Sequence, residues 1–170
     1  MDDHLTISLA LNVDNAFPNF VDATQHRLYG GLRMLVGDDA EDVAQETYLR
    51  AYRSLLQYPP ARIRQLELRP WLWTIALNAT RNRRRTNARR PLVLVDQLPD
   101  TPQHRAEPID DALVAAIRSL PHAQGAAVVL HYVLGHTYAE VAQILDRPEG
   151  TVKSDASRAL ATLRTKGLEA

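Results

Sequence analysis

Hydroxyl and cationic side chains gather at helical spacing near the end of the sequence. They are Thr151, Lys153, Ser154, Ser157 and Arg158. Groups of this kind donate hydrogen bonds to phosphate oxygens and to acceptors on base edges. Because their spacing leaves them on the outer side of a helix, we interpret the segment from Thr151 onward as a DNA-reading helix.

The residues around this group predict two helices joined by a tight turn. Thr137 and Glu140 have the spacing of a capping box at a helix start. An apolar stripe follows at Val141, Ala142 and Leu145. Residues 146–150 combine a proline and a glycine, which is typical of a turn. The inner side of the second helix is expected to hold Val152, Ala156, Ala159, Leu160 and Leu163. This pattern indicates a helix-turn-helix; the alternative is a helical hairpin inside an ordinary all-helical protein.

A second group of chemical interest combines tryptophan with arginine. Residues 62–90 contain nine arginines against one acid, Glu67, whereas the whole chain has no net charge. Stacking surfaces beside phosphate-binding charge suit a single-stranded or melted nucleic acid. The alternative is that Trp71 and Trp73 belong to the core. Because residues two apart on a helix do not face the same side, we expect at least one of them to be partly exposed.

The elements that position these groups are predicted to be helical. A first helix is expected over 16–36 and a second from near Asp39, with its buried face at Ala40, Val43, Ala44, Thr47, Tyr48, Ala51, Tyr52 and Leu55. Residues 57–68 are expected to form a loop, and Pro70 suits the first turn of a third helix. A helix from Asp110 and another over 123–134, ended by Gly135, precede the helix-turn-helix.

Several classes of function find no support in the sequence. No cysteine is present, and the six histidines show no metal-binding spacing. His131 and His136 are interpreted as a polar helix face and a turn. There is no glycine-rich phosphate loop, no catalytic constellation, no signal peptide and no membrane span. We therefore expect a cytoplasmic protein that is not an enzyme and that binds no cofactor, no metal and no small-molecule substrate.

Three segments resemble bacterial sigma factors of the extracytoplasmic-function (ECF) group, in the sigma-70 family. They are residues 39–53, 69–82 and 149–154, in the order and spacing of that family. The resemblance implies an all-α fold of two small helical domains joined by an acidic, proline-containing linker. The first would be a region 2-like domain over 16–90, followed by a linker over 91–108 and a region 4-like helix-turn-helix domain over 109–168.

The resemblance also implies partners and residue roles. The partners are core RNA polymerase, through its beta and beta-prime subunits, and promoter DNA; an anti-sigma factor is common in the family. The positions that match the polymerase-docking face are Asp42, Gln45, Glu46, Leu49, Arg50 and Arg53. Those that match capture of a flipped minus-ten base are Arg62, Arg64, Trp71, Asn78, Arg81, Arg84 and Arg85. Thr151, Lys153, Ser154, Ser157 and Arg158 match the helix that reads the minus-thirty-five element.

Some residues depart from the family pattern. Asp155 and Leu160 stand on the recognition helix where basic residues are usual, and Asp146 stands where a turn glycine is usual. Aspartate tolerates that left-handed backbone better than most residues. Asp155 near DNA would repel phosphates, although it could accept from a cytosine amino group. Two alternatives therefore stay open: a sigma-like interaction protein that binds polymerase or an anti-sigma protein without reading promoters, and a free-standing helix-turn-helix repressor.

Overall fold

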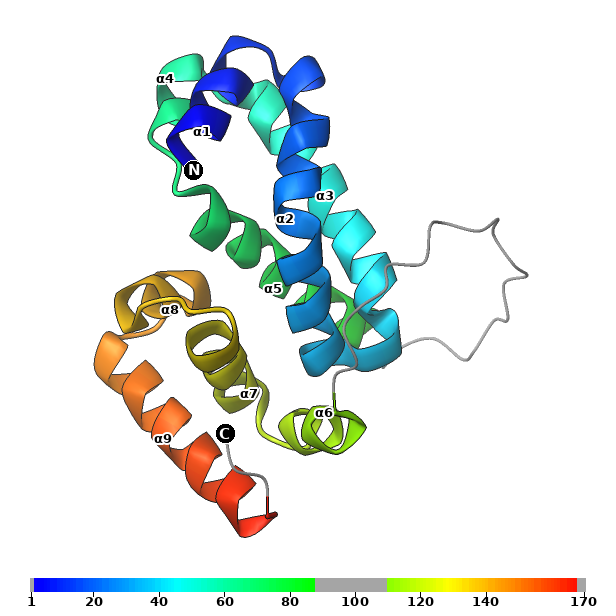
Figure 1. Ribbon diagram of the computed structural model, residues 1–170, viewed down its shortest axis with the longest axis vertical. Coiled ribbons are helices and arrows are strands. Elements are labelled where there is room, and N and C mark those ends of the chain that lie inside the picture. Colours follow the sequence, from blue (N-terminus) through cyan, green and yellow to red (C-terminus); the bar gives the residue numbers. More distant parts are fainter. Residues whose placement is uncertain (1, 88–109, 168–170) are drawn as a thin grey trace, which may run out of the picture.

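The computed structural model describes residues 2–87 and 110–167, and within them every regular element is a helix (Figure 1). The N-terminal group is α1 (Asp2–Leu11), α2 (Val13–Val36), α3 (Ala40–Gln57), α4 (Pro60–Arg64) and α5 (Leu68–Asn87). The C-terminal group is α6 (Asp111–Arg118), α7 (His122–Val128), a π-helical turn η2 (Val129–Val133), α8 (Tyr138–Leu145) and α9 (Glu149–Thr165). The predicted all-α fold of two helical domains is confirmed, and the predicted linker over 91–108 lies outside the described residues.

The antiparallel pair α2 and α3 forms the body of the N-terminal domain. The Asn12 side chain caps α2 by accepting from the Asn15 amide at 3.0 Å, and a single 3-10 turn over Gly37–Asp39 separates the two helices. The predicted inner face of α3 is confirmed, with Val43, Thr47, Ala51 and Leu55 among its buried residues. Thr47 satisfies its buried hydroxyl by donating to the Val43 carbonyl at 2.6 Å.

Two short helices were not expected from the sequence. One is α1, and the other is α4, which lies within the predicted 57–68 loop and begins at Pro60 after Pro59. A proline suits a first helical position because its missing N–H has no intrahelical partner there. Apolar residues of α1 fall on both sides of the helix, since Leu9 is buried and Leu11 is exposed, so the sequence shows no single apolar stripe.

The two tryptophans of α5 differ in exposure, as expected. Trp73 is buried and Trp71 is half-buried, which confirms that the two cannot share one environment. Trp73 points back to α2, where a Cβ placed on Gly31 would come within 2.7 Å of its ring. A side chain on Gly31 would therefore force the two helices apart.

The C-terminal domain follows the predicted order of helices. The Asp110 carboxylate caps α6 by accepting from the Ala112 amide at 2.9 Å. The helix predicted over 123–134 is α7, which continues into the wider turn of η2, where the Leu134 amide donates to the Val129 carbonyl at 3.0 Å. Gly135 then reverses the chain with a φ of 77°.

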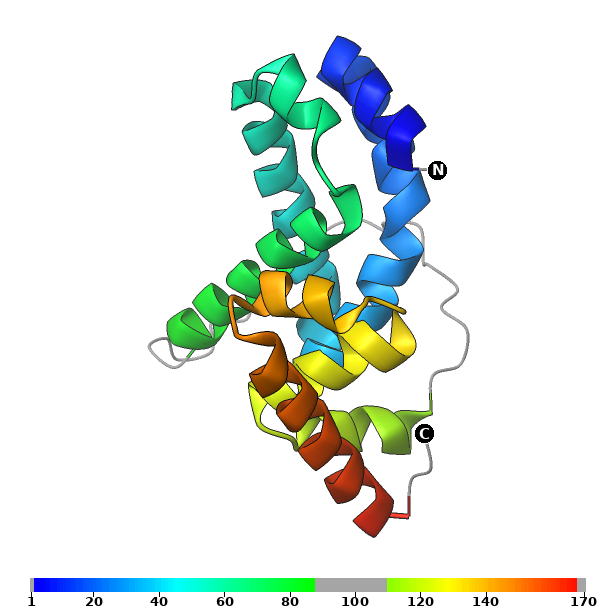
Figure 2. The ribbon, with the colours of Figure 1, turned by 90° about the vertical axis from the view of Figure 1, so that its left-hand side faces the viewer.

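The two domains are packed against each other. Helix α8 lies against α5, and α6 lies against α2 (Figures 1 and 2). Leu134 of the C-terminal domain reaches the space beside Gly31 that Trp73 also borders. Apolar surface is thus buried between the domains, which favours this closed arrangement of the free chain.

Candidate nucleic-acid interface

The start of the helix-turn-helix is fixed by its capping box. The Thr137 hydroxyl accepts from the Glu140 amide at 3.2 Å, and the Glu140 carboxylate accepts from the Thr137 amide at 2.6 Å. Both hydrogen bonds occupy amides that have no partner inside the helix. Burial alone would raise the pKa of Glu140, but the Thr137 hydrogen bonds and the neighbouring His136 outweigh it. The pKa of Glu140 is therefore lowered, and the carboxylate stays charged at neutral pH.

The turn is made by Asp146 in a left-handed conformation. Its φ is 52°, and its amide donates to the Gln143 carbonyl at 3.2 Å while the Arg147 amide donates to the Ala142 carbonyl at 3.0 Å. These bonds close the carbonyl end of α8 as a C-cap does. The expectation that aspartate replaces the usual glycine here without breaking the turn is confirmed.

The outer side of α9 carries the residues that the sequence assigns to DNA. They are all exposed: Thr151, Lys153, Ser154, Ser157 and Arg158. The Lys153 ammonium lies 2.7 Å from the Glu149 carboxylate and 5.7 Å from the Tyr138 ring centre. The Ser154 hydroxyl donates to the Gly150 carbonyl at 2.9 Å and keeps its lone pairs available. The outer face of α9 therefore combines three hydroxyl groups with the positive charges of Lys153 and Arg158.

Asp155 does not belong to this outer face. Its side chain is only 8% exposed, and its two oxygens lie 2.9 Å from the Arg147 guanidinium and 3.4 Å from that of Arg158. Asp155 is therefore not an exposed acid of the proposed DNA face, because its carboxylate bridges Arg147 of the turn and Arg158 of the recognition helix. Leu160, the other departure, is half-buried.

The residues assigned to base capture lie on α4 and α5. Trp71 stands between two other aromatic rings, with centroids 6.5 Å from Phe20 and 6.3 Å from Tyr58. The Arg62 guanidinium sits 3.8 Å above the Tyr58 ring, an arrangement that holds the cation beside an aromatic surface. Arg64, Asn78 and Arg81 are exposed. Arg84 and Arg85 lie farther along α5, where only the backbone is described.

The outer face of α3 is the third candidate surface. Asp42, Gln45, Glu46, Leu49 and Arg53 are exposed there, and Arg50 is half-exposed. The Arg50 guanidinium lies 2.6 Å from the Glu46 carboxylate one turn away, so this pair is neutral as a unit. Leu49 is 49% exposed between these charged groups. An exposed apolar residue ringed by charge is the composition of a protein-binding surface.

Comparison with known proteins gives the family. The sigma-70 region 2 family matches residues 20–90, and the sigma-70 region 4 family matches residues 110–163. The chain is 34% identical over 141 residues to the ECF RNA polymerase sigma factor SigM of Mycobacterium tuberculosis, covering 81% of this chain and 68% of that protein. The chain belongs to the ECF group of the sigma-70 family. The ECF RNA polymerase sigma-E factor of Haemophilus influenzae is also similar, at 28% identity over 168 residues, covering 89% of this chain and 87% of that protein.

Solved structures agree with this fold. The sigma factor RpoE from Bartonella quintana, in complex with the anti-sigma factor NepR, aligns with a TM-score of 0.70 at 24% identity, over 88% of this chain and 94% of that one. CnrH, in complex with the cytosolic domain of CnrY, aligns with a TM-score of 0.69 at 22% identity, over 96% and 95%. As a sigma factor, the protein directs promoter-specific initiation by RNA polymerase, and its family consists of initiation factors rather than enzymes.

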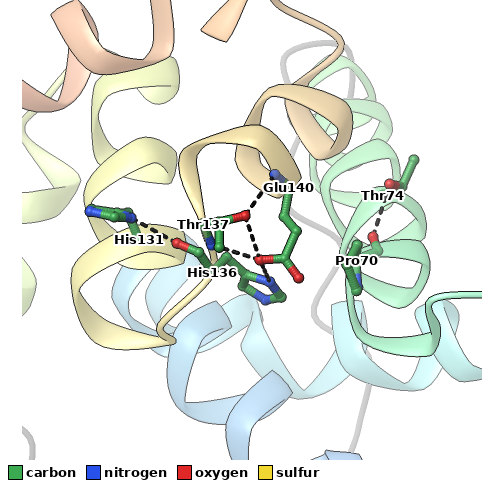
Figure 3. A network of polar contacts seen from close by, with 6 residues as sticks. All are labelled: Pro70, Thr74, His131, His136, Thr137 and Glu140. Carbon is green, nitrogen blue, oxygen red and sulfur yellow. Dashed lines mark hydrogen bonds and ion pairs between the residues drawn. The ribbon is translucent and has the colours of Figure 1, made fainter. Parts of the chain in front are cut away.

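One polar network of the C-terminal domain was missed from the sequence, and it lies where this domain packs against α5. His136 is only 6% exposed, and its ring lies 3.8 Å from the Glu140 carboxylate (Figure 3). Burial lowers the pKa of His136, and the positive charges of Arg69 and Arg27 lower it further, although Glu140 opposes them. The carbonyl of His136 also meets the His131 ring at 2.7 Å.

The interpretation of His136 as an ordinary turn residue therefore misses its position. A small pocket opens beside it, bordered by Arg27 of α2 and Arg69 of α5. Since these residues are distant in sequence, no local pattern could have placed them together. Within residues 2–87 and 110–167, no group of three or more His, Cys, Asp or Glu side chains is placed to hold a metal ion. No helix in these ranges is long and apolar enough to cross a membrane.

Proposed function

We propose that this sigma factor divides its work among three surfaces on different helices. The region 2-like domain over 16–90 would dock on core polymerase and open the promoter, and the region 4-like domain over 109–168 would read the upstream element, with 91–108 as the linker between them. The observation that carries this proposal is the separation of the candidate surfaces among α3, α4 with α5, and α9, each with exposed side chains suited to its role.

The proposed polymerase-docking surface is the outer face of α3. It consists of Asp42, Gln45, Glu46, Leu49, Arg50 and Arg53. Leu49 would fill an apolar depression on the polymerase, and the charged residues around it would set orientation and association rate. Support comes from the exposure of Leu49 in a face whose opposite side is fully committed to the core.

The proposed minus-ten surface runs from α4 onto α5. It consists of Arg62, Arg64, Trp71, Asn78, Arg81, Arg84 and Arg85. A base turned out of the duplex would stack near the aromatic group of Trp71 and Tyr58, and its polar edge would be read by hydrogen bonds. The arginines would hold phosphates on either side, which supplies affinity but little sequence information.

The proposed minus-thirty-five surface is the outer side of α9, with Thr151, Lys153, Ser154, Ser157 and Arg158. Asp155 supports this reading rather than opposing it, because its ion pairs hold Arg158 and the turn in place from inside the domain. The alternative of a sigma-like protein that reads no promoter was based on Asp155 and Leu160. Because Asp155 is buried, its charge no longer argues against DNA binding by α9.

The closed arrangement cannot serve both promoter elements at once. The minus-ten and minus-thirty-five elements lie about 25 base pairs apart, or roughly 85 Å along the duplex at about 3.4 Å per step. In the closed chain, α8 lies against α5. The domains would therefore separate when polymerase binds.

Other partners follow from the relatives. One structural neighbour is a complex with the anti-sigma factor NepR, and another is a complex with the cytosolic domain of CnrY. We therefore expect an anti-sigma protein to bind this chain when polymerase is absent. We expect it to act in the cytoplasm, where bacterial DNA and polymerase are. We also expect polymerase, and not this protein, to catalyse RNA synthesis.

The test separates docking from opening. Arg81→Glu should reduce promoter opening, measured by permanganate reactivity of unpaired thymines, while leaving polymerase affinity nearly unchanged. Leu49→Arg should reduce polymerase affinity, and opening should recover at saturating protein. Equal loss of both properties in both variants would refute the division of labour between α3 and α5.

A further inference from the structure

Helix α4 has little structure of its own to hold it in place. It contains five residues, and Ile63 is the one that it buries. A helix this short does not form without external packing, because the cost of its first turn is not recovered. The pair Pro59 and Pro60 determines where α4 begins, but it does not determine where the helix lies relative to the domain.

The helix that α4 packs against, among those described, is chiefly α1. The two lie together at one end of the N-terminal domain (Figure 1). On α1, Leu9 is completely buried, and Thr6 and Ala10 are buried with it. The Thr6 hydroxyl donates to the Asp3 carbonyl at 2.8 Å, so this buried polar group has a hydrogen-bond partner.

Helix α1 is in turn attached to the body of the domain. It packs against α2, and the Asn12 amide donates to the Ser8 carbonyl at 3.0 Å before Asn12 caps α2. The start of α2 is tied to α3 by the Tyr52 hydroxyl, which donates to the Asp14 carboxylate at 2.6 Å. Besides the short chain connection from α3 through Tyr58 and Pro59, α4 is therefore joined to the body of the domain through α1 and α2.

We propose that α1 is a positioning element for minus-ten recognition: it sets where α4 lies and hence how selectively the minus-ten base is accepted. The proposal rests on the proposed function of α4 and α5. Residues 2–11 lie outside the segment that matches the region 2 family, 20–90, and they include none of the residues assigned to polymerase or DNA. Leu9 would act through α4 without touching DNA itself.

The helix offers a matched pair of leucines for the test. Leu9 is 0% exposed and Leu11 is 74% exposed on the same helix. In the full-length protein with core polymerase, transcription is measured from a mapped promoter and from versions with single minus-ten substitutions. Leu9→Ala should lower the ratio between the native and substituted templates by about tenfold, because small displacements of a positioned group cost this much or more. Leu11→Ala should leave the ratio unchanged, and Leu9→Met should restore most of it.

Polymerase affinity distinguishes positioning from general damage. It should change less than about twofold in Leu9→Ala, since the docking residues lie on α3, outside the contact between α1 and α4. An equal loss of affinity and selectivity would mean that Leu9 only supports the fold, and it would overturn the proposal. Ile63→Ala approaches the same contact from α4, and it should lower selectivity without adding to Leu9→Ala.

The outcomes also separate this inference from the function on which it rests. If the wild-type protein starts equally from native and substituted templates, then α4 and α5 do not read the minus-ten element, and the proposed function fails together with the inference. If the wild type discriminates and Leu9→Ala discriminates equally well, the inference alone is overturned.

Discussion

The Arg147 guanidinium lies 2.9 Å from the Asp155 carboxylate, so the turn of the helix-turn-helix is tied to the inner side of the recognition helix. Arg158 approaches the other oxygen of the same carboxylate at 3.4 Å. One buried acid thus orients two arginines, one in the turn and one on the proposed DNA face. An acid that looks unfavourable for DNA binding in the sequence instead organises the DNA-reading module.

Removal of this acid should destabilise the C-terminal domain. We expect Asp155→Ala to lower the free energy of unfolding by about 1–3 kcal/mol, because it removes hydrogen bonds between charged groups. Glu149→Ala is the control, since its partner Lys153 is exposed and surface pairs contribute below about 1 kcal/mol. Thermal unfolding monitored by circular dichroism makes the comparison. Equal effects of the two substitutions would show that the buried ion pairs of Asp155 contribute no more to the free energy of unfolding than an exposed pair does.

Asp155→Arg gives a sharper form of the same test. It would place a third guanidinium between Arg147 and Arg158, so we expect a larger loss of stability than with alanine and no gain in DNA affinity by the folded protein. A stable variant with tighter non-specific binding would contradict the buried position of Asp155.

Arg158 should contribute one phosphate contact. We expect Arg158→Ala to reduce the slope of log affinity against log salt by about one unit for duplexes that carry the minus-thirty-five element. Titrations with holoenzyme at several salt concentrations measure this slope. Lys166→Ala is the control, because Lys166 donates to the Ser119 hydroxyl at 2.6 Å, away from the proposed DNA face. An unchanged slope in Arg158→Ala would place that arginine outside the interface.

Leu49 should dominate docking on polymerase. We expect Leu49→Arg to weaken binding of core polymerase by at least about tenfold, as removal of a central apolar anchor does. Its thermal unfolding should stay unchanged, because the side chain is half-exposed in the free protein. Leu11→Arg makes the same chemical change on α1 and should leave polymerase binding intact. Similar losses in both variants would indicate a non-specific effect of added charge.

The contact between the domains should weaken in acid. The pKa of His136 is lowered from 6.5 in the closed chain by burial, by Arg69 and by Arg27, and only Glu140 opposes this. A histidine whose pKa is depressed stabilises the state that buries it at high pH, and that stability is lost as the pH falls below the pKa of the exposed ring. Protonation would place a third positive charge beside the two arginines, so the closed form should lose population below about pH 6.5.

Energy transfer between the domains measures this population. The sequence contains no cysteine, so Glu41→Cys and Ala161→Cys, both at exposed positions, give unique labelling sites. Transfer should fall between about pH 8 and about pH 5. His136→Gln should remove most of this dependence, and a pH profile identical to that of the wild type would exclude His136 as its origin.

Local signals in the sequence predicted the helix-turn-helix well. The capping box at Thr137 and Glu140 and the left-handed Asp146 depend on residues within a few positions of each other, and both are confirmed. The inner face of α3 was also predicted, because burial on one side of a long helix leaves a periodic pattern. The residue assignments to polymerase and DNA stay predictions.

Features that depend on distant residues were missed. The helices α1 and α4 are short, and each is stabilised by packing rather than by its own pattern. Asp155 pairs with one arginine of the turn and one of the recognition helix, and His136 lies beside residues of α5 and α2. Sequence periodicity reports which side of an element is apolar, but it does not report which element covers it.

The most direct test of the account is transcription of fragmented genomic DNA by core polymerase with and without this protein, followed by mapping of RNA 5′ ends. The account predicts new, discrete start sites that share a minus-ten and a minus-thirty-five sequence and that disappear with Arg81→Glu. Polymerase binding without any new start site would contradict it.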